Sequence, residues 1–439
     1  MMKIFDRFES EVRSYCRSFP TVFTRGSGYR LFDETDREYL DFFSGAGALN
    51  YGHNHPELKR RLIEYLEQDG VTHSLDMATA AKREFLERFH RIVLRPRGLD
   101  YKVQFTGPTG TNAVEAALKL ARKVKRRPNV AFFTNAYHGM TLGALAVTGN
   151  AAKRAGAGVP LDHAVPVPFE GYRGAGRDSL EYLESLLDDS SSGFDRPAAV
   201  IVETVQAEGG INVASFPWLR RLAALTRAHD VLLIVDEVQV GCGRTGTFFS
   251  FEPAGIEPDV VCLSKSIGGF GLPMALVLLR PELDVWSPGE HNGTFRGNNL
   301  AFVAAAAALD YWEDDSFAAD VRRKSELACR LLEEVLERHP ESRGSLRGRG
   351  LILGLDLPAE GLASRVSRAA FRRGLVIETA GARDNVLKLL PPLIIDDVGL
   401  RQGIDILEAA LAEALEEAPA EHPEAFLRGP ALLETEAAP

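Results

Sequence analysis

Residues 231–269 read VLLIVDEVQVGCGRTGTFFSFEPAGIEPDVVCLSKSIGG and decide the fold. The run 231–235 is apolar and rich in β-branched residues, which predicts a strand covered on both faces, and Asp236 follows at its carboxyl end. A second short apolar run, 260–263, is followed by Ser264 and Lys265. In an open α/β sheet, ligands bind at the carboxyl ends of the strands. The sequence therefore predicts that Asp236 and Lys265 meet at one edge of a sheet.

The lysine stands out because arginine is the usual cation of this chain. Only eleven of the 51 basic residues are lysines. A Schiff base needs a primary amine with a lowered pKa, which arginine cannot supply, although a lysine at a strand end can also simply extend to solvent. Enzymes that use pyridoxal phosphate (PLP) need such a lysine together with a carboxylate that keeps the pyridine nitrogen protonated. Lys265 and Asp236 suit these two tasks.

The same stretch contains a competing motif. Residues 241–246, GCGRTG, match the dinucleotide fingerprint G-x-G-x-x-G, which leaves a non-catalytic or nicotinamide-binding α/β protein as an alternative. That fingerprint should open a helix, but the following residues, TFFSFEP, are aromatic and end in proline. We therefore expect a glycine-rich loop here.

Size and composition limit the function further. A chain of 439 residues with 45% hydrophobic and 26% charged residues predicts a large and a small globular domain. The net charge of −10 argues against nucleic-acid and anionic-membrane partners, and no apolar stretch is long enough for a membrane span. The acidic, amphipathic start is unlike a signal peptide. Four cysteines without a C-x-x-C pair predict reduced thiols, a cytoplasmic location and no metal site.

Strand and helix patterns alternate through the middle of the chain. Apolar runs at 130–134 and 197–202 read as strands, and a helix near 216–229 precedes the Asp236 strand, which predicts a mainly parallel sheet. From about residue 316, long amphipathic helices and short strands predict a change of domain. We expect the chain to contain an N-terminal segment contributing to the small domain (1–50), the large domain (51–315), the small domain (316–417) and a loosely ordered tail (418–439).

Small residues precede a predicted helix at 105–112, FTGPTGTN. Backbone N–H groups at such a helix start, with the helix dipole, bind phosphate. Asn112 and Glu115 have the spacing of a capping box, so an ordinary helix cap is an equal interpretation. No Gly-Lys-Ser/Thr follows, which excludes a nucleotide P-loop.

Together these segments resemble the class III (subgroup II) PLP-dependent aminotransferases of fold type I, over the chain to about residue 415. The resemblance implies an α/β fold with a mainly parallel seven-stranded sheet and a smaller α+β domain. It implies that Lys265 holds PLP and moves the proton, that Asp236 pairs with the pyridinium nitrogen, and that Tyr137 stacks on the ring. The remaining cofactor contacts that it implies are Gly110, Thr111, Asn112, His138, Glu203, Gln239 and, from a neighbouring subunit, Thr294.

The resemblance also implies the substrates. Segments 11–20, 45–53 and 109–123 are similar to those of family members that move the amine of L-glutamate to L-aspartate 4-semialdehyde, giving L-2,4-diaminobutyrate, as the first step of ectoine biosynthesis. The implied substrate contacts are Glu208, Lys388 and Asn50. Lys388 stands where many relatives have an arginine that clamps the glutamate α-carboxylate, and a lysine cannot make that two-pronged contact. Arg383 is the next candidate for the clamp.

Some alternatives and partners also come with the resemblance. The ω-amine could instead be ornithine or 4-aminobutyrate, the chain could be an aminomutase, and diaminobutyrate could supply a siderophore or peptide pathway. Because Thr294 would reach the neighbouring phosphate, a homodimer is the smallest complete assembly that it implies, and a larger homo-oligomer is compatible. A potassium requirement is also compatible with it.

Overall fold

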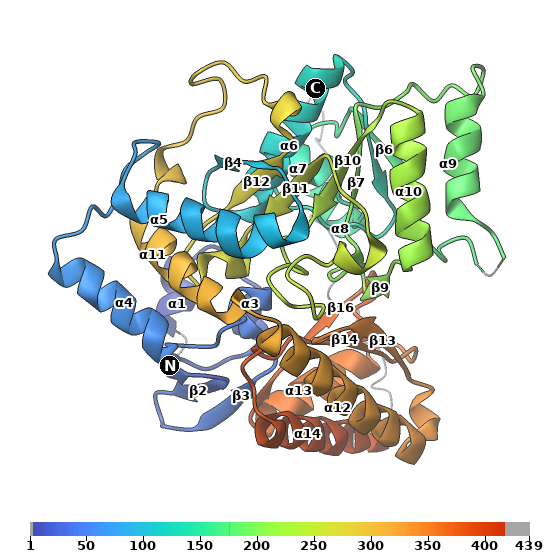
Figure 1. Ribbon diagram of the computed structural model, residues 1–439. Helices are drawn as coiled ribbons and strands as arrows, with labels where there is room; N and C mark the ends of the chain where they lie inside the picture. The colour runs from blue at the N-terminus through green and yellow to red at the C-terminus, as the bar shows by residue number, and fades with distance from the viewer. Residues whose placement is uncertain (1–2, 175, 418–439) are drawn as a thin grey trace, which may run out of the picture.

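A seven-stranded sheet forms the centre of the molecule (Figure 1). The computed structural model describes residues 3–174 and 176–417, so the predicted tail 418–439 lies outside the described residues. The strand order is β4-β12-β11-β10-β7-β5-β6, and only β12 runs against the others among the described strands. The strands are β4 (Lys102–Phe105), β5 (Val130–Phe133), β6 (Ala164–Val167), β7 (Ala199–Val202), β10 (Leu232–Asp236), β11 (Val260–Leu263) and β12 (Leu276–Leu279).

Alternating side chains of these strands pack into two different cores. On β10, Leu233 and Val235 contact the core that includes helix α10 (Phe216–Ala228), whereas Leu232 and Ile234 contact the core that includes helix α6 (Gly110–Lys125). Side chains point alternately to opposite faces of a strand, so a strand buried on both faces must be apolar throughout. All five residues of β10 are buried, Asp236 included, and its polar end is therefore exceptional.

The helices of the described chain flank this sheet or form the remainder of the molecule. Their bounds are α1 (Lys3–Phe8), α2 (Tyr15–Ser18), α3 (Ser44–Gly47), α4 (Pro56–Glu67), α5 (Ala80–Phe89), α7 (Leu142–Ala146), α8 (Ala151–Ala155), α9 (Ser179–Asp188), α11 (Asn299–Ala308), α12 (Ser316–Arg338), α13 (Leu362–Arg372) and α14 (Asp397–Glu416). No described helix combines the length and the apolar character needed to cross a membrane.

Two further four-stranded sheets lie beside α12, α13 and α14 (Figure 1). The first joins β1 (Phe23–Ser27), β2 (Arg30–Asp33) and β3 (Glu38–Asp41) to β15 (Leu375–Val376), with β3 and β15 parallel. The second has the order β13 (Ser345–Arg349), β14 (Ile352–Asp356), β17 (Val386–Leu389) and β16 (Glu378–Ala380), and a separate pair is β8 (Val205–Gln206) with β9 (Asn212–Val213). Segments from the beginning and the end of the chain thus share one sheet. The domain boundaries at residues 50 and 315 stay a prediction.

The start of the chain forms two short helices, α1 and α2, and neither buries a side chain that would stabilise a longer one. The capping box of Asn112 and Glu115 is absent: α6 begins at Gly110, and Glu115 instead accepts hydrogen bonds from the backbone N–H groups of Gly143 and Ala144.

Candidate active site

A cavity of about 270 Å³ lies at the carboxyl ends of β10 and β11. It is lined by residues from several segments that are distant in the sequence. The residues that the sequence predicted and that line it are Gly110, Thr111, Tyr137, His138, Glu203, Glu208, Asp236, Gln239 and Lys265. Because parallel strands end at the same edge, the fold brings these side chains together as expected.

Lys265 begins a 3₁₀ helix (Lys265–Gly268) just after β11. Its backbone has φ = 53°, in the left-handed region that a residue with a side chain rarely adopts. Such strain is found at functional sites, where the surrounding structure maintains it. Burial lowers the pKa of Lys265 to about 8, against the opposing charge of Glu208, so a larger share of its amine is neutral near physiological pH than in an exposed lysine.

Asp236 presents a carboxylate to the same cavity. Its Oδ2 lies 2.7 Å from Nδ1 of His138, and its Oδ1 accepts a hydrogen bond of 3.0 Å from the N–H of Val238. Burial opposes protonation of His138, but the hydrogen bond and charge of Asp236 outweigh it and raise the pKa of the imidazole. The two groups therefore form a buried charge-assisted pair that holds the carboxylate in one orientation.

The first turn of α6 closes one end of the cavity. Gly110 and Thr111 line it, and the helix runs for 16 residues behind them. A Cβ atom on Gly110 would lie 2.7 Å from a methyl group of Val238, so only glycine allows this close approach. Asn112 does not line the cavity, and its Oδ1 accepts a hydrogen bond from the Thr109 hydroxyl instead.

Tyr137, Glu203 and Gln239 form the rest of the polar lining. Glu203 Oε1 accepts a hydrogen bond of 2.8 Å from the Tyr137 N–H, and burial raises the pKa of Glu203 to about 7. Gln239 donates from Nε2 to Ala46 O and to Glu208 Oε1. Its buried Oε1 has no hydrogen-bond partner among the described residues, and so can accept one from a bound molecule.

Beyond Gln239, Glu208 belongs to a buried ionic cluster. Lys388 Nζ lies 2.5 Å from Glu208 and 2.9 Å from Glu378, and the lysine is fully buried. Burial alone would lower the pKa of Lys388, but the two carboxylates raise it, which keeps the lysine charged. Burial likewise opposes ionisation of Glu208, but the charges of Lys388 and Lys265 prevail and lower its pKa.

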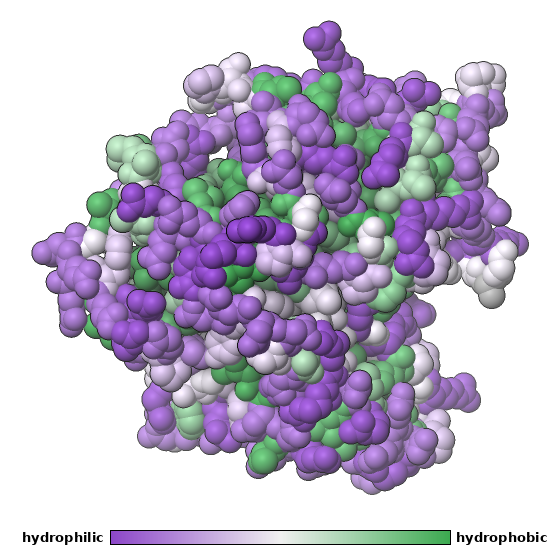
Figure 2. All heavy atoms as spheres, viewed as in Figure 1, coloured by the Kyte–Doolittle hydropathy of each residue, from purple (hydrophilic) through white to green (hydrophobic). Residues whose placement is uncertain are grey.

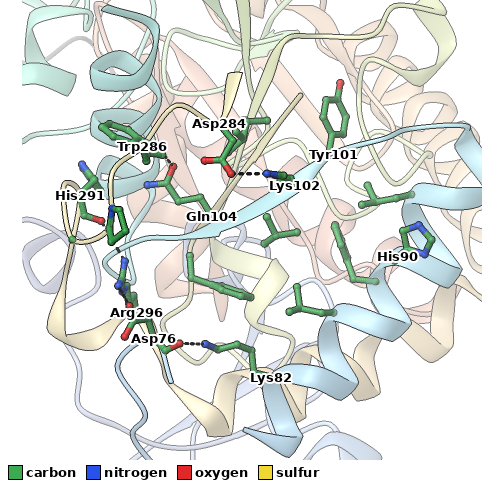
Figure 3. A pocket seen from close by; sticks show the side chains of 18 of the residues that line it. Asp76, Lys82, His90, Tyr101, Lys102, Gln104, Asp284, Trp286, His291 and Arg296 are labelled. Carbon is green, nitrogen blue, oxygen red and sulfur yellow. Dashed lines mark hydrogen bonds and ion pairs between the residues drawn. The ribbon is translucent and has the colours of Figure 1, made fainter. Parts of the chain in front are cut away.

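A larger cavity, of about 640 Å³, lies along the edge strand β4 and helix α5 (Figure 3). Its charged groups are satisfied locally: Lys102 pairs with Asp284 at 2.8 Å, and Arg296 pairs with Asp76. Neither Asp236 nor Lys265 lines it. The larger cavity therefore lacks Lys265, Asp236 and the start of α6, which distinguish the smaller one.

Known proteins with similar sequences and folds identify the family. The model of the class-III aminotransferases matches residues 13–411. A diaminobutyrate–2-oxoglutarate transaminase of Nocardia farcinica is 61% identical over 93% of each chain, and one of Bordetella parapertussis is 60% identical over 95% of this chain and 96% of the relative. An ornithine aminotransferase structure from Toxoplasma gondii covers 94% of both chains with a TM-score of 0.82 and 27% identity. The chain belongs to the class-III aminotransferases.

This aminotransferase is PLP-dependent, as the sequence predicted, and the cavity fits that cofactor. The glycine-lined start of α6 suits the phosphate, because free N–H groups there bind anions. The carboxylate of Asp236, held by His138, suits a protonated ring nitrogen. The strained Lys265 supplies the primary amine.

Four predicted site residues of the aminotransferase do not line the cavity: Asn112 and Lys388, described above, and Asn50 and Thr294. Asn50 is buried, and its amide donates to Cys242 O at 2.8 Å while its oxygen accepts from Arg244 at 2.5 Å. Asn50 therefore takes part in the protein's internal hydrogen bonding, and its substrate contact stays a prediction. Thr294 lies in a 3₁₀ turn (Thr294–Arg296), next to Phe295, which is 65% exposed. Thr294 does not line the cavity, and its contact with the phosphate of a neighbouring subunit stays a prediction.

The dinucleotide motif does not open a regular helix, and two residues near the cavity were not predicted from the sequence. Residues 241–250 form turns, and no regular helix follows before the 3₁₀ helix Glu252–Ala254, so the fingerprint was a chance match as expected. Glu378 was missed, although its place in a short apolar strand was a usable signal. Lys153, which packs on the ring of Tyr137 at 4.2 Å from its centroid, was also missed, because an exposed helix carries it.

Proposed function

We propose that this chain transfers the amine of L-glutamate to L-aspartate 4-semialdehyde, giving 2-oxoglutarate and L-2,4-diaminobutyrate, in a reversible reaction. Identities of 60–61% to diaminobutyrate–2-oxoglutarate transaminases over nearly the whole chain support this substrate pair. The single observation that carries the chemistry is the cavity that joins Lys265 and Asp236. We further propose that this is the first step of ectoine biosynthesis and takes place in the cytoplasm.

The residues of the cavity have separate roles in this proposal. Bound PLP supplies a ring that withdraws electrons from the substrate carbon. Lys265 holds the cofactor and then moves a proton to and from the reacting carbon, for which its lowered pKa is suited. Asp236 keeps the ring nitrogen protonated, Gln239 contacts the phenolic oxygen, and Tyr137 covers the ring. Gly110 and Thr111 hold the phosphate.

Lys388 and Glu208 take part in choosing between the two amino donors. Glutamate has a carboxylate on the reacting carbon, whereas C4 of diaminobutyrate has none. In the proposal, Glu208 neutralises Lys388 when diaminobutyrate is bound, and moves away so that Lys388 can attract the glutamate α-carboxylate. The alternative clamp, Arg383, is exposed and follows Ala382, which lines the adjoining cavity.

A homodimer is part of the same proposal. Exposed apolar residues lie on two neighbouring segments that also supply Asp76 and Arg296 to the larger cavity: Val71, Leu75, Met77 and Phe295. Figure 2 shows separate apolar areas on an otherwise hydrophilic face. Contiguous exposed apolar surface marks interfaces between proteins. A second copy covering this region would bring its own Thr294 towards the phosphate end of the cavity.

The test is a comparison of amino donors with 2-oxoglutarate as the acceptor. Purified, PLP-loaded protein is assayed with diaminobutyrate, ornithine and 4-aminobutyrate, and glutamate formation is measured. We expect the highest kcat/KM for diaminobutyrate. A higher value for either other amine would assign the chain to a different ω-aminotransferase activity.

A further inference from the structure

The entrance to the candidate active site adjoins a second cavity of about 610 Å³. Tyr137 and Glu208 line both cavities, so the second one leads past them towards Lys265. Lys153, on the short helix α8, lines this outer cavity. A substrate bound at Lys265 and longer than the inner cavity can extend past Tyr137 and Glu208 into the space that Lys153 lines.

Lys153 is the free cation of this entrance. Its Nζ lies 4.2 Å from the centroid of the Tyr137 ring and forms no ion pair among the described residues, although its charge helps to lower the pKa of Glu208, which lines the same cavity. Lys388, in contrast, is fully buried between Glu208 and Glu378. Lys265 is reserved for the cofactor. Lys153 is therefore the cation that lines the outer cavity, whereas Arg383 follows Ala382 and does not line it among the described residues.

The chemistry of the substrates calls for such a cation. In L-glutamate, the reacting carbon is Cα, and the side-chain carboxylate lies at the far end of the molecule. In L-2,4-diaminobutyrate, the reacting carbon is C4, and its only carboxylate lies the same number of carbon–carbon bonds away. Both amino donors thus carry a distal carboxylate at a matching distance, and one positive group at that position can bind either.

We propose that Lys153 binds the distal carboxylate shared by both amino donors and by their keto and aldehyde products. This inference rests on the proposed function for the identity of the donors, but its central test does not. Tyr137 holds the Lys153 side chain over its ring, which limits the positions of the ammonium before substrate arrives. Lys153 is then a specificity-determining residue that admits amines bearing a carboxylate.

The test compares Lys153→Ala, Lys153→Arg and a charge control, Lys125→Ala. Lys125 lies at the far end of α6, about 22 Å along the helix from Gly110 at 1.5 Å per residue. Asp230, the ion-pair partner of Lys125, still pairs with Arg127 in this variant. The variant therefore removes one positive charge at a position far from the site. Lys153→Ala is expected to fold, because the lost lysine is only half-buried and alanine favours a helix.

The first measurement is the dissociation constant of glutarate, a dicarboxylate without an amine, by calorimetry on the PLP-loaded protein. Lys153→Ala should weaken glutarate binding on the order of 10- to 100-fold, as expected for a lost hydrogen bond between charged groups. Lys153→Arg should largely retain binding, and Lys125→Ala should not change it. Unchanged glutarate affinity in Lys153→Ala would overturn the proposal.

The second measurement is the KM of each amino donor in the same variants. Lys153→Ala should raise the KM for glutamate and for diaminobutyrate by similar factors and change kcat less. An increase for only one donor would contradict a shared carboxylate site. If the wild-type protein does not use diaminobutyrate, the proposed function fails, while the glutarate comparison still decides the role of Lys153.

Discussion

The ammonium of Lys388 lies 2.9 Å from the carboxylate of Glu378, which is its antiparallel neighbour in the sheet formed by β16 and β17. A second carboxylate, of Glu208, approaches the same nitrogen from a different segment of the chain. Strands β16 and β17 thus place a carboxylate and an ammonium at adjacent positions. Glu208, from a third segment, connects this pair to the candidate active site, whose cavity it lines.

This cluster leads to a prediction about stability. Lys388→Met leaves two buried carboxylates without a cation, and should lower the free energy of unfolding by about 3–5 kcal/mol. Urea unfolding of the apo-protein measures the change. Adding Glu378→Gln should recover part of the loss, because it removes one unpaired charge. A double variant as unstable as Lys388→Met would show that Glu378 does not contribute to this balance.

The amine of Lys265 should titrate far below an ordinary lysine. Burial lowers its pKa to about 8, compared with roughly 10.4 for an exposed lysine. Only the neutral amine is nucleophilic, so the rate of PLP uptake by the apo-protein should rise with pH and level off above about 8. Stopped-flow absorbance measures it, and Lys265→Ala, which lacks the amine, should show no borohydride-sensitive band.

The same shift has a consequence for stability. Between about pH 8 and 10, the unfolded chain still holds the proton that folded Lys265 has lost. The free energy of unfolding of the apo-protein therefore rises with pH in this interval through this group. Lys265→Met should remove that part of the slope. An identical pH dependence in the variant and the parent would contradict the lowered pKa.

Asp236 should matter for both cofactor affinity and turnover. Asp236→Asn removes the negative charge facing the ring nitrogen and should lower kcat on the order of 100-fold or more, as for other charge-stabilising contacts in buried sites. His138→Gln keeps the carboxylate and only loosens its orientation, so a smaller loss is expected. Steady-state assays at saturating PLP compare the two. Equal losses would mean that His138 acts by more than orienting Asp236.

The close approach at the start of α6 can be tested by a paired substitution. Gly110→Ala places a Cβ atom 2.7 Å from Val238 and should displace the helix start, weakening PLP about 10-fold through its phosphate contacts. Fluorescence titration measures the dissociation constant. Val238→Ala in the same chain removes the clashing methyl groups and should restore much of the affinity. Failure to restore it would locate the defect elsewhere.

Local patterns in the sequence were enough to predict the strands and the cavity's main groups. The run 231–235 and the run 260–263 are apolar without interruption, because strands buried on both faces require it, and each is followed by a polar residue. Since parallel strands end at one edge, Asp236 and Lys265 had to lie near each other. The false dinucleotide motif could be rejected for the same kind of local reason.

Other features depend on contacts that no local pattern contains. The environment of Asn50 is set by Cys242 and Arg244, almost 200 positions later in the chain, and its side chain forms hydrogen bonds with both. Glu115 fits a capping box by spacing, but the tertiary structure gives it the N–H groups of another helix. Hydrogen bonds between distant segments override local preferences whenever burial makes them the only available partners.

The sequence by itself determined the fold class and the pair formed by Lys265 and Asp236, because both follow from periodicity, strand ends and residue chemistry along the chain. It determined the family through its resemblance to the class III aminotransferases. Only the tertiary structure decided that Lys388 is enclosed by two carboxylates and that Lys153 faces the entrance beside Tyr137. The physical reason is that charge balance depends on distances in space, and those distances join segments whose separation in sequence carries no information about them.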